Sequence, residues 1–452
     1  MTSQQLATFD WKRYPETAEF LNQRIDTFCA QSSRIKQFAS DLQTRTGTRL
    51  IDWVDHFELH WSDELEQTLA GLGYEAARGL KFKLFQHPAA HFPAIQASTG
   101  ESERLSVRVD SVVDFLAIHQ CALELPIEGT PGASVRQRLV FHENGVELHV
   151  IERHGVRIDT VKKQPDPDLK DLLNHTQAFR LRKRDFAGDI DGFEHAESMI
   201  RIAIEDLGVD LTCDLFFAAE RAYWQQRNVV ARIQKGRQDL LGVGWANHDH
   251  HTYRSSRTQF WRLISLFELL GFQLRERFYA GKEAGWGAQV LEHPTTGVVI
   301  FADVDLSPEE VSQDFAHEPL PELNELGTVG LWCRLHGEAF LQAGMHHLEC
   351  LFDFTAARDQ LADENDVKTM KPFTDLPHLK QAFTAGEIWP VEESRIQSLL
   401  DDGLITIEEA DKFREKGAIG SHLEILQREE GFKGFNQSGI NDIIQETNPL
   451  KQ

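Results

Sequence analysis

Three short segments in the C-terminal part of this 452-residue chain carry closely spaced histidine and glutamate residues. They are Asn247–Arg254 (NHDHHTYR), Met345–Glu349 (MHHLE) and Ser421–Arg428 (SHLEILQR). The first stands directly before the amphipathic stretch 258–272, an order that predicts a strand, a polar turn and a helix. Imidazole and carboxylate groups bind divalent metals, so the three segments predict a mononuclear metal site.

Taken together, one residue from each segment gives a recognised ligand set: His250, His347 and Glu424. Two neutral imidazoles and one carboxylate on one face of a metal leave adjacent positions open, as in non-haem Fe(II) oxygenases. Long stretches of chain separate the three residues, so we expect them on separate strands. The doubled histidines leave His251 and His346 as alternatives, because a shift of one residue turns a strand side chain to the opposite face.

An internal repeat links this region to the first part of the chain. Both parts place an Asp-His pair before a helix that ends in Leu-Gly-aromatic, then a His-Pro pair, then an apolar strand that ends in arginine. The matching segments are Trp53–Phe57 with Asn247–His251, Leu72–Tyr74 with Leu270–Phe272, His87-Pro88 with His293-Pro294, and Leu148–Arg153 with Leu423–Arg428. Several matches in one order indicate two homologous halves.

The repeat predicts an α+β protein built of tandem βαβββ modules in two pseudo-repeated halves, with helical insertions such as residues 390–416. We predict a first half at 1–158, a linker at 159–195 and a metal-binding, catalytic half at 196–452. The linker contains a polar, proline-bearing run at 162–168.

The two predicted halves differ at the ligand positions. The first half has His56, but its second strand (105–110) has no histidine, and His149 stands where the other half has Glu424. This set lacks the residues that usually hold a divalent metal, so we predict that the first half is a degenerate, non-catalytic copy.

The composition limits the classes of binding partner and the cell compartment that we expect for this protein. A net charge of -24 repels phosphate backbones and anionic lipid, so neither nucleic acid nor a membrane surface is an expected partner. No apolar run approaches the roughly 20 residues that span a bilayer, and we see no signal peptide. The five cysteines are scattered and odd in number, which is typical of a reducing cytoplasm. The sequence is compatible with a homo-oligomer.

Residues 220–452 carry a set of motifs in a fixed order. An Asp-His pair is followed by an arginine four residues after the histidine (Asp249-His250 and Arg254), then by Glu292-His293-Pro294. A histidine-bearing strand follows at 344–348, and then Glu424 with Arg428 four residues later and Gly434-Phe435. In these motifs the chain resembles the 2-oxoadipate dioxygenase/decarboxylase family of the vicinal oxygen chelate superfamily. The strand 423–428 also resembles the metal-ligand strand of 4-hydroxyphenylpyruvate dioxygenase.

The resemblance implies an Fe(II) enzyme with His250, His347 and Glu424 as metal ligands. Arg254 would bind a substrate carboxylate through its planar guanidinium. The substrates would be O2 and a small 2-oxo acid like 2-oxoadipate, and the products a 2-hydroxy acid and CO2. Other divalent metals are alternatives to Fe(II), since the binding affinities and coordination geometries of these metals overlap. No organic cofactor is expected.

Two other functions fit the same scaffold. One is a metal-dependent lyase or isomerase of the glyoxalase type, and the other is a non-catalytic small-molecule binding protein. Glu292 is an alternative metal ligand.

Overall fold

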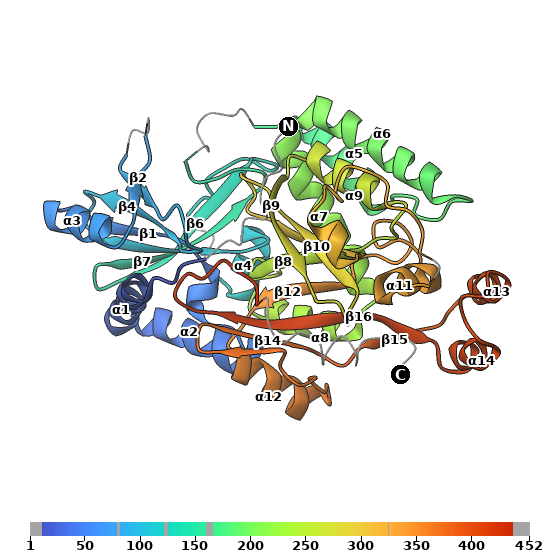
Figure 1. Cartoon of the computed structure of the whole chain (residues 1–452). Helices are drawn as coiled ribbons and strands as arrows, with labels where there is room; N and C mark the ends of the chain where they lie inside the picture. Colours follow the sequence, from blue (N-terminus) through green and yellow to red (C-terminus); the bar gives the residue numbers. More distant parts are fainter. Residues whose placement is uncertain (1–10, 79–81, 122–124, 160–165, 324, 437–452) are drawn as a thin grey trace.

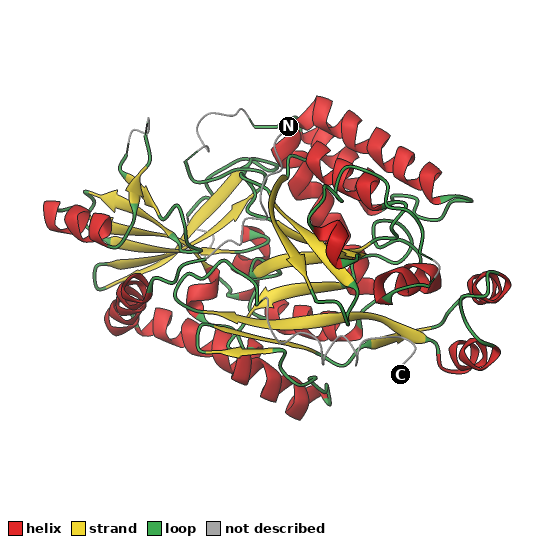
Figure 2. Cartoon of the chain, viewed as in Figure 1, coloured by secondary structure: helices red, strands yellow, loops and turns green. Residues whose placement is uncertain are grey.

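The strands of the chain form two separate β-sheets, with helices around them (Figures 1 and 2). We describe a computed structural model covering residues 11–78, 82–121, 125–159, 166–323 and 325–436. The first sheet contains β1 Val54–His60, β2 Glu75–Ala76, β3 Leu84–Gln86, β4 Ala94–Ser98, β5 Glu103–Arg108, β6 Val135–Glu143 and β7 Val146–Arg153. The second contains β8 His248–Arg254, β9 Gln273–Tyr279, β10 Trp286–Glu292, β11 Val299–Asp305, β12 His347–Leu351, β13 Thr374–Leu376, β14 Leu379–Phe383, β15 Glu387–Trp389 and β16 Ala418–Arg428.

The strand order shows the same plan in both sheets. The first runs β2-β3-β4-β1-β5-β7-β6, and the second runs β9-β10-β11-β8-β12-β16-β14-β13, with β15 on β16. At the centre of each, two antiparallel strands (β1 and β5; β8 and β12) are each flanked by a parallel strand. This is the arrangement of tandem βαβββ modules, so the predicted fold class is confirmed.

The helices cover the outer faces of the two sheets and join them. Those of the first half are α1 Pro15–Gln31, α2 Ser33–Thr46, the 3-10 helix η1 Leu50–Trp53, α3 Asp63–Gly71 and α4 Val112–Ile118. Between the two sheets in the sequence come α5 Leu169–Arg180, α6 Asp189–Leu207, α7 Val209–Gln226 and α8 Val229–Asp239. The predicted linker 159–195 thus includes α5 and the start of α6, and its residues 160–165 lie outside the described residues. The second half adds α9 Phe260–Leu269, α10 Pro308–Val311, α11 Thr328–His336, α12 Phe354–Asn365, α13 Glu393–Asp401 and α14 Ile407–Lys416.

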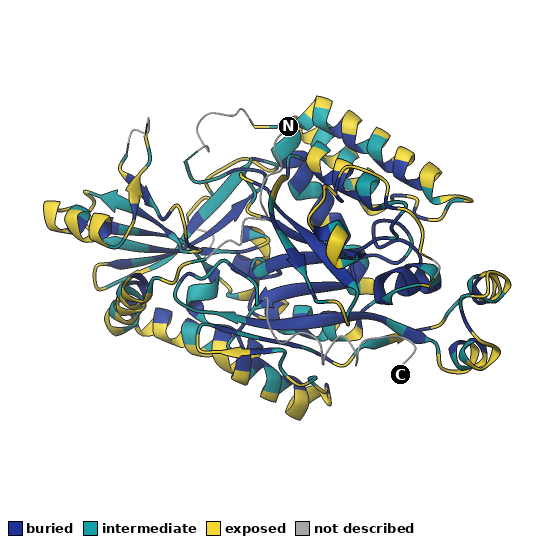
Figure 3. Cartoon of the chain, viewed as in Figure 1, coloured by how far each residue is buried: buried dark blue, intermediate teal, exposed yellow. Residues whose placement is uncertain are grey.

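Each sheet has its own apolar core. In the first half, buried residues of α1 and α2 such as Phe28 and Ile35 pack with Phe57 of β1. In the second half, Phe216 and Phe217 of α7 join a core that includes Phe267 of α9. Figure 3 shows the central strands of the second sheet as buried, whereas α13 and α14 expose much of their surface. These two helices form the predicted insertion at 390–416.

The repeated Leu-Gly-aromatic and His-Pro motifs have a structural explanation. Gly73 and Gly271 both adopt positive φ angles, 86° and 94°. A Cβ atom on either glycine would lie 2.8 Å from Nε2 of His87 or His293, so each imidazole packs directly over a glycine. The glycine therefore supplies both the left-handed turn and the space for the ring. The His-Pro pairs serve packing in both halves.

Candidate metal centre

Three buried side chains converge on the central strands of the second sheet. In the β-ladder, Glu349 of β12 lies opposite His250 on β8 and beside Glu424 on β16. One ligand atom from each residue lies within 4.8 Å of the others. In the described part of the chain, this is the one group of at least three His, Cys, Asp or Glu side chains that meets this criterion.

His347 lies directly beside this group. It precedes Glu349 by two residues, so both side chains lie on the same face of β12. Its Nε2 is 3.7 Å from Glu349 Oε1 and 3.5 Å from Glu424 Oε2. The fold thus brings His250, His347 and Glu424 to one place and adds Glu349. Glu349 is not among the ligands predicted from the sequence, although the His-x-Glu spacing on a strand is a signal for it.

The alternative histidines take other positions. The ring of His251 lies on the opposite face of β8, where its Nε2 is 3.2 Å from a guanidinium nitrogen of Arg221 on α7. His346 contacts His347 through their Nδ1 atoms, which are 2.8 Å apart. The alternative ligand Glu292 forms ion pairs with Arg275 and Lys433 outside the cluster.

The chemistry of the donor set fits a divalent metal. Burial lowers the pKa of His250 to about 4 and that of His347 well below its usual value, so both imidazoles are neutral and free to bind a metal. Burial raises the pKa of Glu424 well above its ordinary value, and its Oε2 has no hydrogen-bond partner. A cation would satisfy that oxygen and compensate the carboxylates of Glu349 and Glu424. Two imidazoles with two carboxylates are donors that suit iron, zinc, nickel or manganese.

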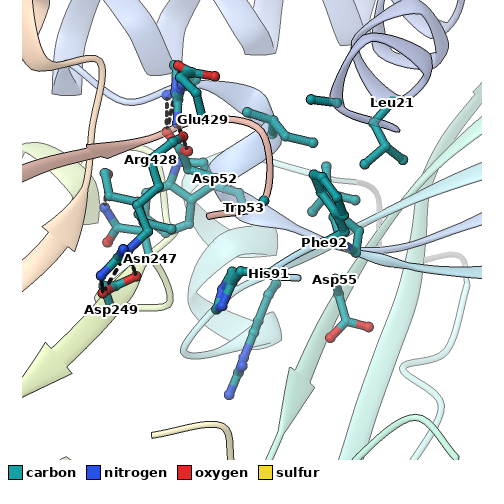
Figure 4. Close-up of a pocket in the computed structure, with 18 of the residues that line it drawn as sticks. Leu21, Asp52, Trp53, Asp55, His91, Phe92, Asn247, Asp249, Arg428 and Glu429 are labelled. Carbon is teal, nitrogen blue, oxygen red and sulfur yellow. Dashed lines mark hydrogen bonds and ion pairs between the residues drawn. The ribbon is translucent and has the colours of Figure 1, made fainter. Parts of the chain in front are cut away.

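A second carboxylate orients the imidazole of His250. Asp249 Oδ2 lies 2.9 Å from His250 Nδ1, which leaves Nε2 toward the cluster. Arg428 donates to both oxygens of Asp249, and this pair lines a cavity of about 280 Å³ between the two halves (Figure 4). The first half repeats this arrangement, with Asp55 Oδ2 at 2.7 Å from His56 Nδ1 and Arg153 bound to Asp55.

This repeat provides a matched pair of variants. Asp249→Asn is expected to weaken metal binding by about 10- to 100-fold, the usual effect of changing the hydrogen-bond partner of a ligating histidine, because the amide is an uncharged and weaker acceptor than the carboxylate. Asp55→Asn makes the same change beside His56 in the first half and should leave metal affinity unchanged. Competitive metal titration with a chelating dye would measure both. Equal loss of affinity in the two variants would contradict a role for Asp249 at the metal.

The first half fills the corresponding positions with a hydrogen-bonded network. Ser106 of β5 lies opposite His56 and beside His149, as Glu349 does between His250 and Glu424. Arg104 stands in the position of His347 and forms ion pairs with Glu58 at 2.8 Å and Glu147 at 3.2 Å. The guanidinium thus supplies the positive charge that a metal would supply in the second half.

The four candidate ligands form part of the wall of a small cavity of about 80 Å³. Aromatic side chains make up much of the rest: Phe278, Trp286, Phe301, Phe373, Phe383 and Phe435. Several buried polar atoms of the wall make no hydrogen bond within the described chain, among them Thr252 Oγ1, Arg254 Nε, Asp303 Oδ1 and His346 Nε2. Because buried polar groups are normally paired, these atoms indicate a site for a polar ligand.

Arg254 is in this wall, on the same face of β8 as His250. Its Nε lies 3.7 Å from Asp303 Oδ2 on the neighbouring strand β11. Burial raises the pKa of Asp303 to about 8, so this carboxyl is protonated at neutral pH. The guanidinium therefore keeps a charge that an anionic ligand can compensate.

Solved structures similar to this chain include a glyoxalase superfamily protein. A protein of that superfamily from Ralstonia eutropha JMP134 aligns with 59% of this chain and 98% of its own, at 10% identity and a TM-score of 0.34. A mutant of 4-hydroxymandelate synthase from Streptomyces coelicolor aligns with 89% of this chain and 99% of its own, at 12% identity and a TM-score of 0.31. Methylmalonyl-CoA epimerase from Mycobacterium tuberculosis covers 40% of this chain and 88% of its own, at 13% identity and a TM-score of 0.24.

The sequence matches no family model. It also matches no curated protein. No helix in the described residues is both long and apolar enough to span a membrane.

Proposed function

We propose that the protein is an Fe(II)-dependent dioxygenase and decarboxylase of a small 2-oxo acid, such as 2-oxoadipate. The observation that carries this proposal is the convergence of His250, His347 and Glu424 in one cavity with Arg254. The first three supply the ligands of a facial triad. Arg254 supplies a cation for an organic acid.

The side chains of the cavity have separate roles in this proposal. Bound Fe(II) would supply the open coordination positions and the electrons for reaction with O2. Arg254 binds a carboxylate of the substrate and fixes its orientation. The aromatic wall excludes water and packs against the carbon chain. In the overall reaction, the 2-oxo acid and O2 give CO2 and a 2-hydroxy acid with one carbon fewer.

One observation favours a second candidate, a metal-dependent isomerase or lyase of the glyoxalase type. Glu349 adds a second carboxylate to the two imidazoles and Glu424. Four protein ligands would leave two positions on an octahedral metal, and a bidentate 2-oxo acid would fill both. A carboxylate at the metal could instead move a proton of the substrate, as a general base does.

Metal analysis and oxygen consumption separate the candidates. Stoichiometric iron in the purified protein would argue against a passive binding protein. Iron-loaded protein should then consume O2 and release CO2 with at least one member of a panel of 2-oxo acids, and His347→Ala should not. If no acid supports O2 consumption and His347→Ala behaves as the wild type, the dioxygenase proposal is wrong. Isomerisation of a substrate without O2 would favour the second candidate.

The Arg254–Asp303 pair predicts a pH dependence of substrate binding. Below pH about 8 Asp303 is protonated, so the charge of Arg254 is available to the acid. Above this pH Asp303 ionises and competes for Arg254, so the KM for the 2-oxo acid should rise as the pH increases through about 8. In Asp303→Asn this rise should be absent. Measuring KM from pH 6 to 9 in both proteins checks the prediction, which a parallel rise in both would contradict.

A further inference from the structure

His346 is a buried histidine of the cavity wall that contacts a candidate metal ligand through one ring nitrogen and makes no hydrogen bond with the other. It is 2% exposed, and its Nδ1 lies 2.8 Å from Nδ1 of His347. Its Nε2 makes no hydrogen bond, although the residue lines the cavity. The contact to His347 determines which nitrogen of His346 carries a proton.

Two neighbouring rings and two backbone hydrogen bonds hold His346 in place. Its imidazole makes edge contacts with Trp332 and His422, at ring-centre distances of 5.5 and 5.3 Å. Its backbone N–H donates to the Thr252 carbonyl at 2.9 Å, and its carbonyl accepts from the His422 N–H at 3.2 Å. The ring is therefore positioned before any ligand binds.

Metal binding determines the direction of the His346–His347 hydrogen bond. A hydrogen bond between two imidazole nitrogens needs one N–H and one lone pair. Nε2 of His347 faces the carboxylates of Glu349 and Glu424, so it is the nitrogen that would bind the metal. A metal-bound nitrogen carries no proton, so His347 carries its proton on Nδ1 and donates it to Nδ1 of His346. His346 must then carry its own proton on Nε2.

We propose that the Nε2–H of His346 donates a hydrogen bond to an oxygen of the acid bound at the metal, and so positions that acid. This inference rests on the metal site of the proposed function. It assigns a second donor to the cavity in addition to Arg254. It also explains a buried imidazole nitrogen that has no partner in the described chain. The ligand class is an acid with a carboxylate or keto oxygen next to the metal.

His422 is the alternative acceptor within the protein. Its Nδ1 donates to the Thr384 carbonyl at 3.0 Å, so its Nε2 has a free lone pair and no hydrogen-bond partner. Within the described residues no hydrogen bond joins this Nε2 to the ring of His346, and His422 is not among the residues that line the cavity. His422→Asn keeps a donor for Thr384 and removes this lone pair, so it is the matched control.

The tautomers can be read directly by nitrogen NMR of the zinc-loaded protein labelled with 15N-histidine. We expect His347 to show Nδ1–H and His346 to show Nε2–H, with the opposite assignment in no significant amount. A proton on Nδ1 of His346 would overturn the proposal, because that nitrogen would then be the donor to His347.

Oxalate, a small anion that chelates divalent metals, tests the role in binding. His346→Asn keeps an acceptor near His347 but loses the Nε2 donor, so oxalate affinity of the zinc-loaded protein should fall about tenfold. His346→Gln places an N–H near the position of Nε2 and should recover most of the affinity. His422→Asn should bind oxalate as the wild type does. Zinc content should stay stoichiometric in all three variants.

The outcomes separate this inference from the proposed function. If His346→Asn bound oxalate as tightly as the wild type does, the proposed role of His346 would be overturned. An equal loss of oxalate affinity in His346→Asn and His422→Asn would overturn it as well. If the wild type binds oxalate in a His346-dependent manner but consumes no O2 with any 2-oxo acid, the dioxygenase proposal is wrong while His346 still positions a metal-bound acid.

Discussion

His250→Ala is expected to lower metal affinity by more than about a hundredfold. Loss of a metal ligand should thus cost more affinity than a change in the residue that hydrogen-bonds to that ligand. His250 lies in the centre of the candidate site, opposite Glu349 and within reach of Glu424. Without the imidazole of His250, a cation would be bound by the two carboxylates and by a single neutral nitrogen, that of His347. Any turnover that depends on the metal should fall to the same extent. Metal content after dialysis and competitive titration would measure the loss.

Glu292→Gln is the control for this variant. Glu292 is also a carboxylate of the second sheet, but its partners are Arg275 and Lys433. Its replacement should leave metal content unchanged. Circular dichroism and thermal unfolding of His250→Ala would show that the fold is retained. A fully metal-loaded His250→Ala, or metal loss in Glu292→Gln, would contradict the proposed ligand set.

Glu220→Ala should destabilise the protein by about 3–5 kcal/mol, the usual effect of removing one partner of a buried ion pair. Glu220 of α7 is 1% exposed and accepts hydrogen bonds from Arg182, Arg184 and the Tyr253 hydroxyl. Without the carboxylate, two arginine charges stay buried with no compensating charge. The midpoint of urea unfolding, followed by tryptophan fluorescence, would measure the change.

Glu197→Ala provides the matched control on α6. Its carboxylate pairs with Arg201 one turn later, and both side chains are largely exposed, at 42% and 59%. Exposed pairs of this kind contribute about 0.3–0.5 kcal/mol, so the unfolding midpoint should hardly move. Both variants should retain metal, since Glu220 binds Tyr253 on the face of β8 opposite His250. Similar losses of stability would contradict the assigned role of burial.

The repeat in the sequence was enough to predict tandem βαβββ modules in two pseudo-repeated halves, and to align the ligand positions of the two halves. Alignment of Asp55-His56 with Asp249-His250, and of His149 with Glu424, agrees with the strand registers of the two sheets. Short motifs at strand ends and turns survive in both halves because glycine φ angles and ring packing constrain them locally. A second copy of each motif therefore indicated the shared plan.

Other features of the site could be determined only from the tertiary structure. Strand alternation places His250 and His251 on opposite faces, but it does not say which face the helices cover. Packing of Phe217 against His251 decides this, at a ring-centre distance of 5.1 Å. Similarly, the pairing of Arg254 with Asp303 depends on which strand lies beside β8.

The sequence by itself determined the residue types, their alternation along each strand and the correspondence of the halves, because these depend on local chain geometry. Only the tertiary structure decided that Glu349 joins the candidate ligands, that Arg104 fills the equivalent position in the first half, and that His346 contacts His347 beside a cavity. These contacts depend on strand order and register. Strand order and register arise from the packing of segments far apart in the chain, and local sequence patterns do not specify that packing.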